Sequence, residues 1–362
     1  MSDNTSIEWT TTTWNPTTGC DKVSPGCGLP RPGSDDEQTG RTGGCYAMTM
    51  ARRLKAMGQE KYQNDGDPRT SGPGFGVTMH PDALTDPLGW TKPRKVFVNS
   101  MSDLFHEQVS DEFIAKVFAV MIAAPQHTFQ VLTKRHGRMR FLLNSEAHAE
   151  RVAAELAALW RVDRVAPLRG PVENIWLGVS AEDQKWADIR IPALVKTPAA
   201  IRFVSAEPLL GPITLHHGHT HCPTHDFSGG FCTGTCPDRI TPDWVISGGE
   251  SGPGARPAHP DWFRQLRDDC TTAGIAYFHK QHGAYTPVRD RPQPGDLWVY
   301  PDGTSTKWGP EDGHVRRYDR EFRADTFDGE SVLVRRVGKK NAGRELDGRT
   351  WDEFPTTRTA VA

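Results

Sequence analysis

Residues 96–132 read VFVNSMSDLFHEQVSDEFIAKVFAVMIAAPQHTFQVL, and the order of apolar segments in this stretch decides the fold class. Residues 96–98 and 129–132 are short apolar runs rich in β-branched and aromatic residues, which is typical of buried strands. Residues 111–125 between them place apolar side chains at helical spacing. A strand, a helix and a second strand in this order predict two parallel strands joined by a right-handed crossover.

The same alternation continues on both sides of this stretch. Helices are expected at 145–160 and 261–274, and the second ends at a glycine. Further strands are expected near residues 8–14 and at 175–179, 201–204, 244–246 and 275–278. A total of about seven strands alternating with helices predicts an α/β fold, a partial or full (β/α) barrel of the TIM-barrel kind.

The pattern changes near residue 286. Residues 297–303 (LWVYPDG) and 331–338 (SVLVRRVG) have the composition of strands. We therefore expect a barrel-like catalytic domain at 1–285 and a small β-rich extension at 286–362. Two segments look inserted into the barrel. Residues 28–44 are rich in Gly and Pro and predict a flexible loop, and residues 216–238 are rich in His and Cys.

The bulk composition excludes some classes of protein. The 43 basic and 45 acidic residues nearly cancel, so no global basic field is available to hold nucleic acid. No apolar run reaches the roughly 18 residues that a membrane span needs. The first residues, MSDNTSIEWT, lack the charged and apolar regions of a secretion signal. We expect a cytoplasmic protein with no membrane partner.

Polar side chains follow the expected strands, where parallel strands of an α/β fold form the active face. Ser, Asp and Asn at such places can simply be turn or helix-cap residues. Lys134, Glu207, Glu250 and Lys280 are poor capping residues, which favours a shared site. The candidate site residues are Asn99, Ser102, Asp103, Lys134, Ser180, Glu207, Gly248, Gly249, Glu250 and Lys280.

Three cysteines lie near the start of the chain. Cys20 and Cys27 are separated by six residues, and Cys27 and Cys45 by 17. Clustered cysteines in a reducing compartment indicate metal binding or catalysis. Three thiolates suit a four-iron cluster that keeps one iron open for an exogenous ligand. A zinc site completed by a fourth ligand, or three cysteines that bind no metal, are the alternatives.

A second group of cysteines lies in the inserted segment at 216–238. Cys222, Cys232 and Cys236, together with His225, have spacings that allow a tetrahedral zinc site. An auxiliary iron–sulfur cluster, or a polar loop without metal, are the alternatives. The remaining cysteine, Cys270, falls within an expected helix and is best explained as a buried small apolar residue.

Several separated segments of the chain, in order, strongly resemble the phage-protein three-Cys-motif family, a family of unassigned function. That family is similar to radical S-adenosylmethionine enzymes, which have a partial barrel with three cysteines after the first strand. This chain departs from the family in having 17 residues rather than two between the second and third cysteines, and a loop of that length still closes on one cluster. The resembling segments are 14–27 (WNPTTGCDKVSPGC), 45–58 (CYAMTMARRLKAMG), 95–107, 128–135, 174–184, 201–213, 243–257 and 338–355.

The resemblance implies a function. Cys20, Cys27 and Cys45 would hold a 4Fe-4S cluster whose open iron binds S-adenosylmethionine, and an electron donor would be a partner. Reductive cleavage would give a 5′-deoxyadenosyl radical, which abstracts hydrogen from a substrate; the cofactor carries this chemistry.

The resemblance also implies roles for the residues at the strand ends. Asn99, Ser102 and Asp103 would bind the amino group of the cosubstrate. The other selected residues have structural alternatives. Gly248-Gly249-Glu250, which would contact adenine or substrate, is otherwise a simple turn. Lys134, Glu207 and Lys280, which would hold a polar or anionic substrate, otherwise form a buried ion-pair network.

The substrate is open at this stage. Local groups of Lys and Arg and the 11 tryptophans suit DNA or a nucleotide, although such basic groups are more often solvated faces. The phage association makes nucleic-acid or nucleotide modification or repair the first class to consider. The alternative function is a metal-stabilised nucleic-acid-binding phage protein without redox chemistry.

Overall fold

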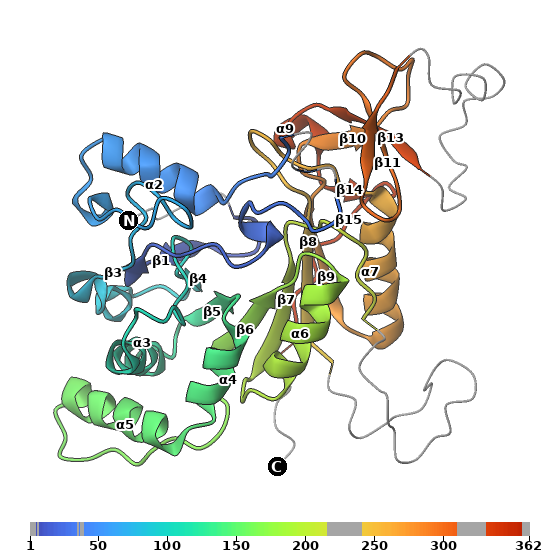
Figure 1. Ribbon diagram of the computed structural model, residues 1–362. Coiled ribbons are helices and arrows are strands. Elements are labelled where there is room, and N and C mark those ends of the chain that lie inside the picture. Colours follow the sequence, from blue (N-terminus) through green and yellow to red (C-terminus); the bar gives the residue numbers. More distant parts are fainter. Residues whose placement is uncertain are drawn as a thin grey trace.

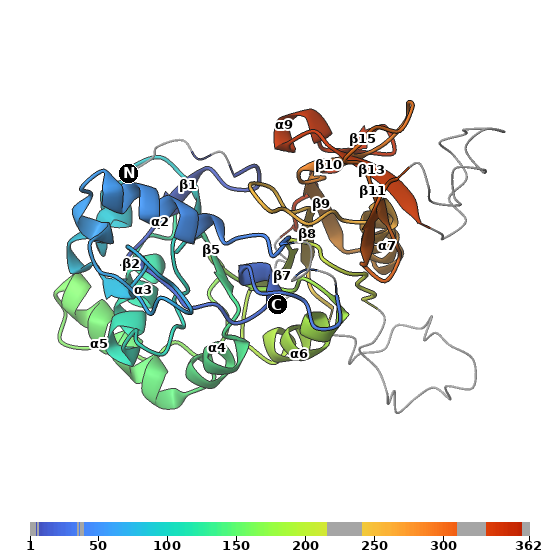
Figure 2. The same ribbon diagram turned by 45° about the horizontal axis from the view of Figure 1, so that its top comes forward.

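The computed structural model describes residues 5, 7–34, 36, 40–215, 241–309 and 331–356. Its main feature is a seven-stranded sheet in which all neighbouring strands are parallel. The sheet curls into a half barrel (Figures 1 and 2). The strands, in spatial order, are β1 (Thr12–Trp14), β4 (Lys95–Val98), β5 (Thr128–Thr133), β6 (Ile175–Ser180), β7 (Ile201–Ala206), β8 (Trp244–Gly248) and β9 (Ala276–Gln281).

The expected partial (β/α) barrel is therefore confirmed, including the number of strands. The opening strand is shorter than the expected 8–14, because only Thr12, Thr13 and Trp14 pair with β4. Trp9, just before it, lies in the core instead.

Helices cover the convex side of the sheet (Figure 2). The three helices expected from periodicity are confirmed as α3, α5 and α7. Ser110 and Ser145 cap α3 and α5 through their side chains, and α7 ends at Gly274 in a left-handed conformation. The helices are α2 (Tyr46–Ala56), α3 (Asp111–Ala123), α4 (His136–Leu143), α5 (Glu146–Trp160), α6 (Gln184–Val195), α7 (Pro260–Ala273) and the short α9 (Lys339–Ala342). None of the helices in the described ranges has the length and hydropathy that a membrane crossing requires.

Alternating side chains of each strand enter two separate cores. The outer core, between sheet and helices, takes residues such as Val131, Leu177 and Val245. It also takes Cys270 of α7, which is fully buried among apolar side chains as expected. Buried apolar area is the main stabilising term of such a layered fold.

A second core, the inner cluster, fills the inside of the half barrel. It consists of side chains from the amino halves of the strands together with residues from both ends of the chain. Its edge-to-face ring contacts include Trp9 with Trp244 at 6.2 Å and Trp176 with Trp244 at 6.1 Å. The buried members are Trp9, Trp176, Ile201, Phe203, Trp244, Ile246 and Phe278, and Ile7, Phe97, Leu132, Ala276 and Phe354 pack against them.

Smaller elements complete the fold. A four-stranded antiparallel sheet follows β9 in the chain, in the order β10-β13-β11-β12. Two strand pairs, β2–β3 and β14–β15, are separate. Bounds are β2 (Thr17–Thr18), β3 (Thr78–Met79), β10 (Tyr285–Pro287), β11 (Leu297–Val299), β12 (Ser305–Lys307), β13 (Val332–Arg336), β14 (Glu345–Leu346), β15 (Arg349–Thr350), η1 (Pro25–Cys27), η2 (Glu60–Tyr62), η3 (Pro81–Ala83) and η4 (Asp86–Gly89).

The last described residues return to the half barrel. Asp352 forms an antiparallel bridge with Phe278 on the edge strand β9, and the His279 amide donates to the Trp351 carbonyl at 2.9 Å. Phe354 then packs on Trp244, with ring centroids 5.0 Å apart. The tail thus covers part of the open edge of β9 and adds an aromatic ring to the inner cluster.

Candidate functional site

Cys20 lies beyond the carboxyl end of β1. The preceding residue, Gly19, forms a parallel bridge with Ser102, which follows β4, so the two strand ends stay side by side. Cys20 packs beside Met101 and the apolar face of α2. The guanidinium of Arg135, just after β5, lies 3.4 Å from its sulfur and donates a hydrogen bond to it. Residues after three neighbouring strands therefore surround this thiol.

Cys27 and Cys45 reach the same place from different elements. Cys27 ends the short helix η1, where its amide donates to the Ser24 carbonyl at 2.8 Å. Cys45 is the N-cap residue of α2. All three thiols are half-buried.

The three thiols lie within electrostatic range of one another. Burial raises the pKa of Cys20, and Asp103, Cys27 and Cys45 raise it further, while Arg135 opposes them. Burial also raises the pKa of Cys45, and Cys27 adds to that rise while Lys134 lowers it. Each thiol therefore interacts electrostatically with at least one of the others. Lys134 and Arg135, the two basic residues after β5, lie within electrostatic range of the three thiols.

A third cation, Arg190 of α6, lies within electrostatic range of Cys27. Its side chain is fully buried, and Nη1 donates to the Ser180 carbonyl at 2.9 Å and to Glu182 Oε2 at 3.0 Å. Its Nε and Nη2 have no hydrogen-bond partner among the described residues. Burial lowers the pKa of Arg190, and Glu182 and Cys27 are the largest opposing influences. Unpartnered N–H groups of a buried cation near a thiol fit a site that takes negative charge.

Glu182 joins this cation to the cysteine loop. Its Oε1 accepts a hydrogen bond from the Gly26 amide, next to Cys27, at 3.3 Å. Burial opposes ionisation of Glu182, but Lys134 and Arg190 hold the pKa of its carboxyl below the usual value. Although burial lowers the pKa of Lys134, Cys27 and Glu182 raise it above its usual value. Lys134, Arg135 and Arg190 partly offset the burial of the thiols, but the pKa values of Cys20 and Cys45 stay above the usual value.

Buried charges anchor the described residues Arg31 and Asp36 of the insertion between Cys27 and Cys45. Asp36 is 1% exposed and pairs with Arg31 at 2.7 Å and with Arg256 at 3.4 Å. Arg256 is also fully buried and donates hydrogen bonds to both carboxylate oxygens of Glu250, at 2.8 and 2.9 Å. The same guanidinium donates to the carbonyl of Pro25 at 2.9 Å. One arginine therefore ties the end of β8 to both sides of Cys27.

A close approach at Gly43 explains one of the glycines in this insertion. Gly43 has φ of 65°, and a β carbon there would lie 2.0 Å from Oε1 of Glu250. Only glycine fits such a position. The Glu250 carboxylate, selected from the sequence as a cofactor contact, thus stands against the cysteine loop with both oxygens bound to Arg256.

The residues after β4 divide into two kinds. Both carboxylate oxygens of Asp103 have hydrogen-bond partners: Oδ1 accepts from the Thr133 hydroxyl at 2.7 Å, and Oδ2 accepts from the Lys134 amide at 2.9 Å. Ser102 donates to the Thr17 carbonyl at 2.8 Å. Asn99 is different, because its backbone is left-handed with φ of 61° and its Oδ1 is buried with no partner in the described part of the chain. Strain combined with a free acceptor is characteristic of a functional position.

Glu207 and Lys280 form an ion pair of 2.9 Å, with side chains 14% and 20% exposed. This is the ion-pair arrangement considered for them from the sequence, although the pair is partly open to solvent. Ser205 donates to Glu207 at 3.3 Å. A β carbon on Gly248 would lie 2.6 Å from Oε1 of Glu207, and one on Gly249 would lie 2.1 Å from the His282 carbonyl. The two glycines therefore make room for the pair and for the chain after β9.

Most predicted site residues meet at the carboxyl edge, but the sequence missed several that organise it. Arg135 and Glu182 follow β5 and β6 among the polar residues at the strand ends, but they are not among the candidate site residues chosen from the sequence. Arg190 lies on a helix, and Arg256 lies in a loop 220 residues from Asp36. Nothing local in the sequence marks these two, because their role depends on contacts across the fold. Cys222, His225, Cys232 and Cys236 lie outside the described residues.

Within the described ranges, no three His, Cys, Asp or Glu side chains are grouped tightly enough to hold one metal ion.

Comparison with known proteins places the chain in a family. One family profile, described as "Protein of unknown function (DUF5131)", matches residues 4–355. The chain belongs to this family. The match spans every described helix and strand of this DUF5131 protein, including all three cysteines of the site and the tail that closes on β9. Neither a curated protein nor a solved structure matches the chain.

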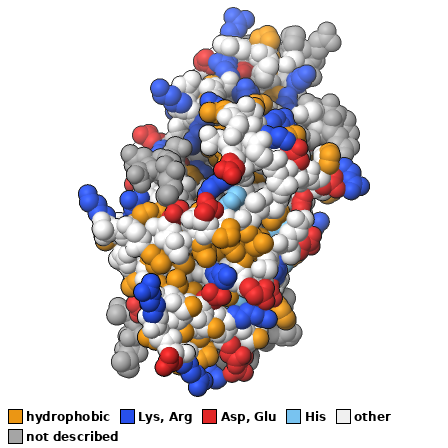
Figure 3. All heavy atoms as spheres, turned by 90° about the vertical axis from the view of Figure 1, so that its left-hand side faces the viewer, with side chains coloured by type: hydrophobic (Ala, Val, Ile, Leu, Met, Phe, Trp, Pro, Cys, Tyr) orange, Lys and Arg blue, Asp and Glu red, His pale blue; other side chains and the backbone are white. Residues whose placement is uncertain are grey.

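The surface that carries α2, α3 and α5 has mixed character. Lys and Arg side chains are interspersed there with Asp, Glu and hydrophobic side chains (Figure 3). Among the described side chains of this face, none form one dominant basic patch.

Proposed function

We propose that this DUF5131 protein is a radical S-adenosylmethionine-type enzyme that holds a 4Fe-4S cluster on Cys20, Cys27 and Cys45. The observation that carries the proposal is the convergence of the three thiols among cations at the carboxyl edge of a parallel half barrel. The resemblance to the phage three-Cys-motif family supports the same assignment. When bound, such a cluster supplies the electron that cleaves S-adenosylmethionine to methionine and a 5′-deoxyadenosyl radical.

Basic residues would balance the charge of thiolates that ligate a cluster. Arg135 donates a hydrogen bond to the sulfur of Cys20, and Lys134 opposes the burial that raises the pKa of Cys45. Hydrogen bonds and positive charge at ligand sulfurs also set the reduction potential of iron–sulfur centres. We assign this role to Lys134, Arg135 and Arg190.

Asn99 is the best candidate to bind the amino group of the cosubstrate. A protonated amine donates hydrogen bonds, and the Asn99 Oδ1 is a buried acceptor without a partner in the described residues. Its amide nitrogen donates to the Thr17 hydroxyl at 2.9 Å, which fixes the direction of Oδ1. Asp103 and Ser102 support this loop rather than contact the ligand, because their oxygens are engaged in the protein.

The Lys280–Glu207 pair is proposed to position a polar group of the substrate. It is partly exposed; Glu207 follows β7, Lys280 lies near the end of β9, and Gly248 lies between them on β8. Nucleic acid or a nucleotide is the first substrate class to test, and an electron donor is the required partner. The inner cluster closes the opposite end of the half barrel and keeps water out from that side.

Anaerobic reconstitution with iron and sulfide tests the proposal. The wild type is expected to bind about four iron atoms per chain with visible absorption. Cys20→Ala should lose most of the iron, because it removes one of three ligands. Cys270→Ala is the matched control: Cys270 is fully buried in the outer core and should leave the iron content unchanged.

Turnover separates an enzyme from a structural cluster. The reduced, reconstituted wild type should convert S-adenosylmethionine to 5′-deoxyadenosine, and Asn99→Ala should bind the cosubstrate more weakly at equal iron content. Stoichiometric zinc without iron at Cys20, Cys27 and Cys45 would instead support the metal-stabilised nucleic-acid-binding alternative. A cluster that never cleaves the cosubstrate would remove the enzymatic assignment.

A further inference from the structure

The turn between β11 and β12, in the small C-terminal sheet, contacts the first part of the chain. The carbonyl of Gly303 in this turn accepts a hydrogen bond from Nη1 of Arg31 at 2.9 Å. The same nitrogen donates to the carbonyl of Leu210, after β7, at 2.9 Å. Trp262 of α7 supports the turn, because its indole N–H donates to the Pro301 carbonyl at 3.0 Å. Arg31 thus joins the small sheet to the half barrel.

The fit between Gly303 and Arg31 is close. Gly303 has φ of 89°, and a β carbon there would lie 2.8 Å from Nη1 of Arg31 and 3.1 Å from the carbonyl oxygen of Leu210. Gly295, just before β11, has a similar φ of 99°, but its β carbon would meet no other described atom within 4 Å. The two glycines share the same backbone requirement and differ in the contact with Arg31.

Buried charges connect Arg31 to Cys27. The Nε and Nη2 atoms of Arg31 donate to the two carboxylate oxygens of Asp36 at 3.0 and 2.7 Å, and Asp36 lies 3.4 Å from Nη1 of Arg256. Arg256 in turn donates to the carbonyl of Pro25 at 2.9 Å, at the start of the short helix that ends at Cys27. The side chains of Arg31 and Asp36 are 11% and 1% exposed, so water competes little for these contacts.

We propose that Arg31 is a positioning residue for Cys27, and that the β11–β12 turn holds Arg31 in place. The small C-terminal sheet is then part of the cysteine site. Displacing Arg31 should loosen the segment around Cys27 but not Cys20, which is held by Arg135 and the residues after β4. The inference rests on the proposed function in taking Cys27 as a cluster ligand, and the loosening itself can be measured without metal.

Alkylation of the metal-free, full-length protein by iodoacetamide, followed for each cysteine by mass spectrometry, tests the inference. A local opening exposes one thiol without unfolding the chain. Gly303→Ala should raise the alkylation rate of Cys27 relative to that of Cys20 by roughly two- to tenfold, the value of one weakened hydrogen bond. Gly295→Ala, the matched control, strains the same kind of backbone away from Arg31 and should leave this ratio unchanged.

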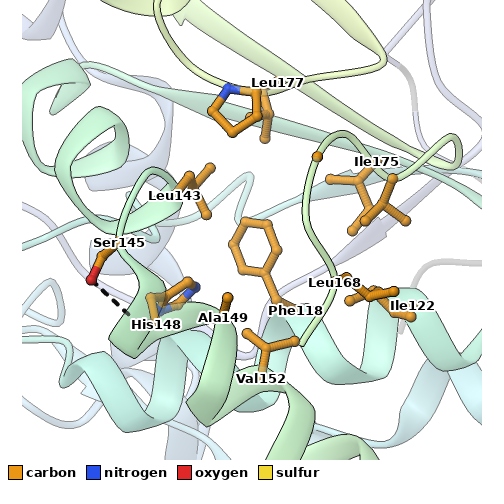
Figure 4. Close-up of a pocket in the computed structure, with 13 residues that line it drawn as sticks. Phe118, Ile122, Leu143, Ser145, His148, Ala149, Val152, Leu168, Ile175 and Leu177 are labelled. Carbon is orange, nitrogen blue, oxygen red and sulfur yellow. Dashed lines mark hydrogen bonds between the residues drawn. The ribbon is translucent and has the colours of Figure 1, made fainter. Parts of the chain in front are cut away.

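Two further measurements control for a general loss of stability. Cys270 is fully buried in the outer core, so its alkylation reports unfolding of the whole chain, and the rise at Cys27 should exceed any rise at Cys270. Val152→Ala enlarges the pocket of about 80 Å³ that Val152 lines with Phe118 on the outer side of the sheet (Figure 4). This variant should destabilise the fold and leave the ratio of Cys27 to Cys20 unchanged.

Removal of the arginine tests the connection directly. Arg31→Ala should raise the same ratio, and Gly303→Ala should add little to it in that background, because the guanidinium that the new methyl group displaces is gone. The proposal is overturned if the two glycine variants give the same ratio. It is equally overturned if the effects of Gly303→Ala and Arg31→Ala are additive, or if Cys27 gains no more than Cys270.

Reconstitution with iron and sulfide separates this inference from the proposed function. The iron content per folded chain should be lower in Gly303→Ala than in Gly295→Ala. If the wild type binds no iron but the alkylation ratios change as expected, the cluster is wrong and the positioning of Cys27 stands. If the wild type binds about four iron atoms and the two glycine variants match it in iron and alkylation, the cluster stands and the positioning is wrong.

Discussion

The two ends of the seven-stranded sheet are built from the same strands and have opposite chemistry. At the amino end, Trp176, Trp244 and Phe278 pack inward with Trp9 and Phe354. At the carboxyl end, the inward and following positions carry an ion pair, buried arginines and the three thiols.

The change from aromatic to charged side chains occurs within single strands. On β9, Phe278 belongs to the inner cluster, and Lys280 two residues later pairs with Glu207. On β8, Trp244 and Ile246 are followed by Gly248, which makes room for that pair. Aromatic burial stabilises the fold, whereas buried charges are costly unless they are paired. The comparison teaches that stability and chemistry are separated along the strands, so substitutions at the two ends should have different consequences.

Trp244→Ala should have the largest effect on stability. Trp244 is fully buried and contacts five aromatic rings of the inner cluster, so its removal should lower the free energy of unfolding by about 3–5 kcal/mol. Urea unfolding measures the loss. The iron content per folded chain should stay at the wild-type level, because the cysteines lie at the other end.

The matched control is Trp160→Ala, at the end of α5, where the ring is 49% exposed. It should change the free energy of unfolding by less than about 1 kcal/mol. If the two tryptophan variants were equally stable, the inner cluster would not be the stabilising end.

Arg256→Met should have the second-largest effect, and it should lower both the free energy of unfolding and the iron content. The substitution leaves Glu250 and Asp36 buried without their shared cation, at a cost of about 3 kcal/mol. It also frees the insertion on both sides of Cys27, so reconstituted iron per folded chain should fall. Urea unfolding and iron analysis of the same preparation give the two results.

Arg169→Met is the control for this variant. Arg169 pairs with Glu146 at 2.8 Å, but both side chains are more than 70% exposed. Exposed pairs contribute less than about 1 kcal/mol, and this one is remote from the cysteines. Full iron content in Arg256→Met would show that the buried ion network stabilises the fold without positioning the thiols.

Asp347→Asn should have the smallest effect, and it should depend on pH. Asp347 holds the tail on α7 through Arg264 and Arg267. The Arg264 hydrogen bond is the main cause that lowers the pKa of Asp347 from 3.8 to about 2. A depressed pKa stabilises the folded state above the unfolded value, and that stabilisation is lost as the pH falls through the folded value. The side chain is 42% exposed, so less than about 1 kcal/mol is expected.

Urea unfolding of wild type and variant should differ at pH 7, and the difference should shrink as the pH falls from about 4 toward about 2. Asp163→Asn, with an exposed side chain, should show no such dependence. A difference that is constant with pH would mean that the carboxylate does not anchor the tail.

Much of the fold could be predicted from local pattern. The apolar runs at 129–132, 175–179 and 201–204 became β5, β6 and β7, because strand formation there depends on residues that are neighbours in the chain. The composition of residues 28–44 indicated a loop but not the ion pairs of Arg31 and Asp36, because Gly and Pro report backbone preference alone.

The sequence by itself determined the strands, the main helices and the three cysteines as a group, since periodicity and spacing are local properties. Only the tertiary structure decided which charges meet. Arg256 lies 231 residues from Pro25 and 220 from Asp36, yet binds both. The sheet also decided that Trp9 and Phe354, from opposite ends of the chain, close the same side of the half barrel. Such contacts depend on how the curled sheet brings distant segments together, and no local pattern encodes that.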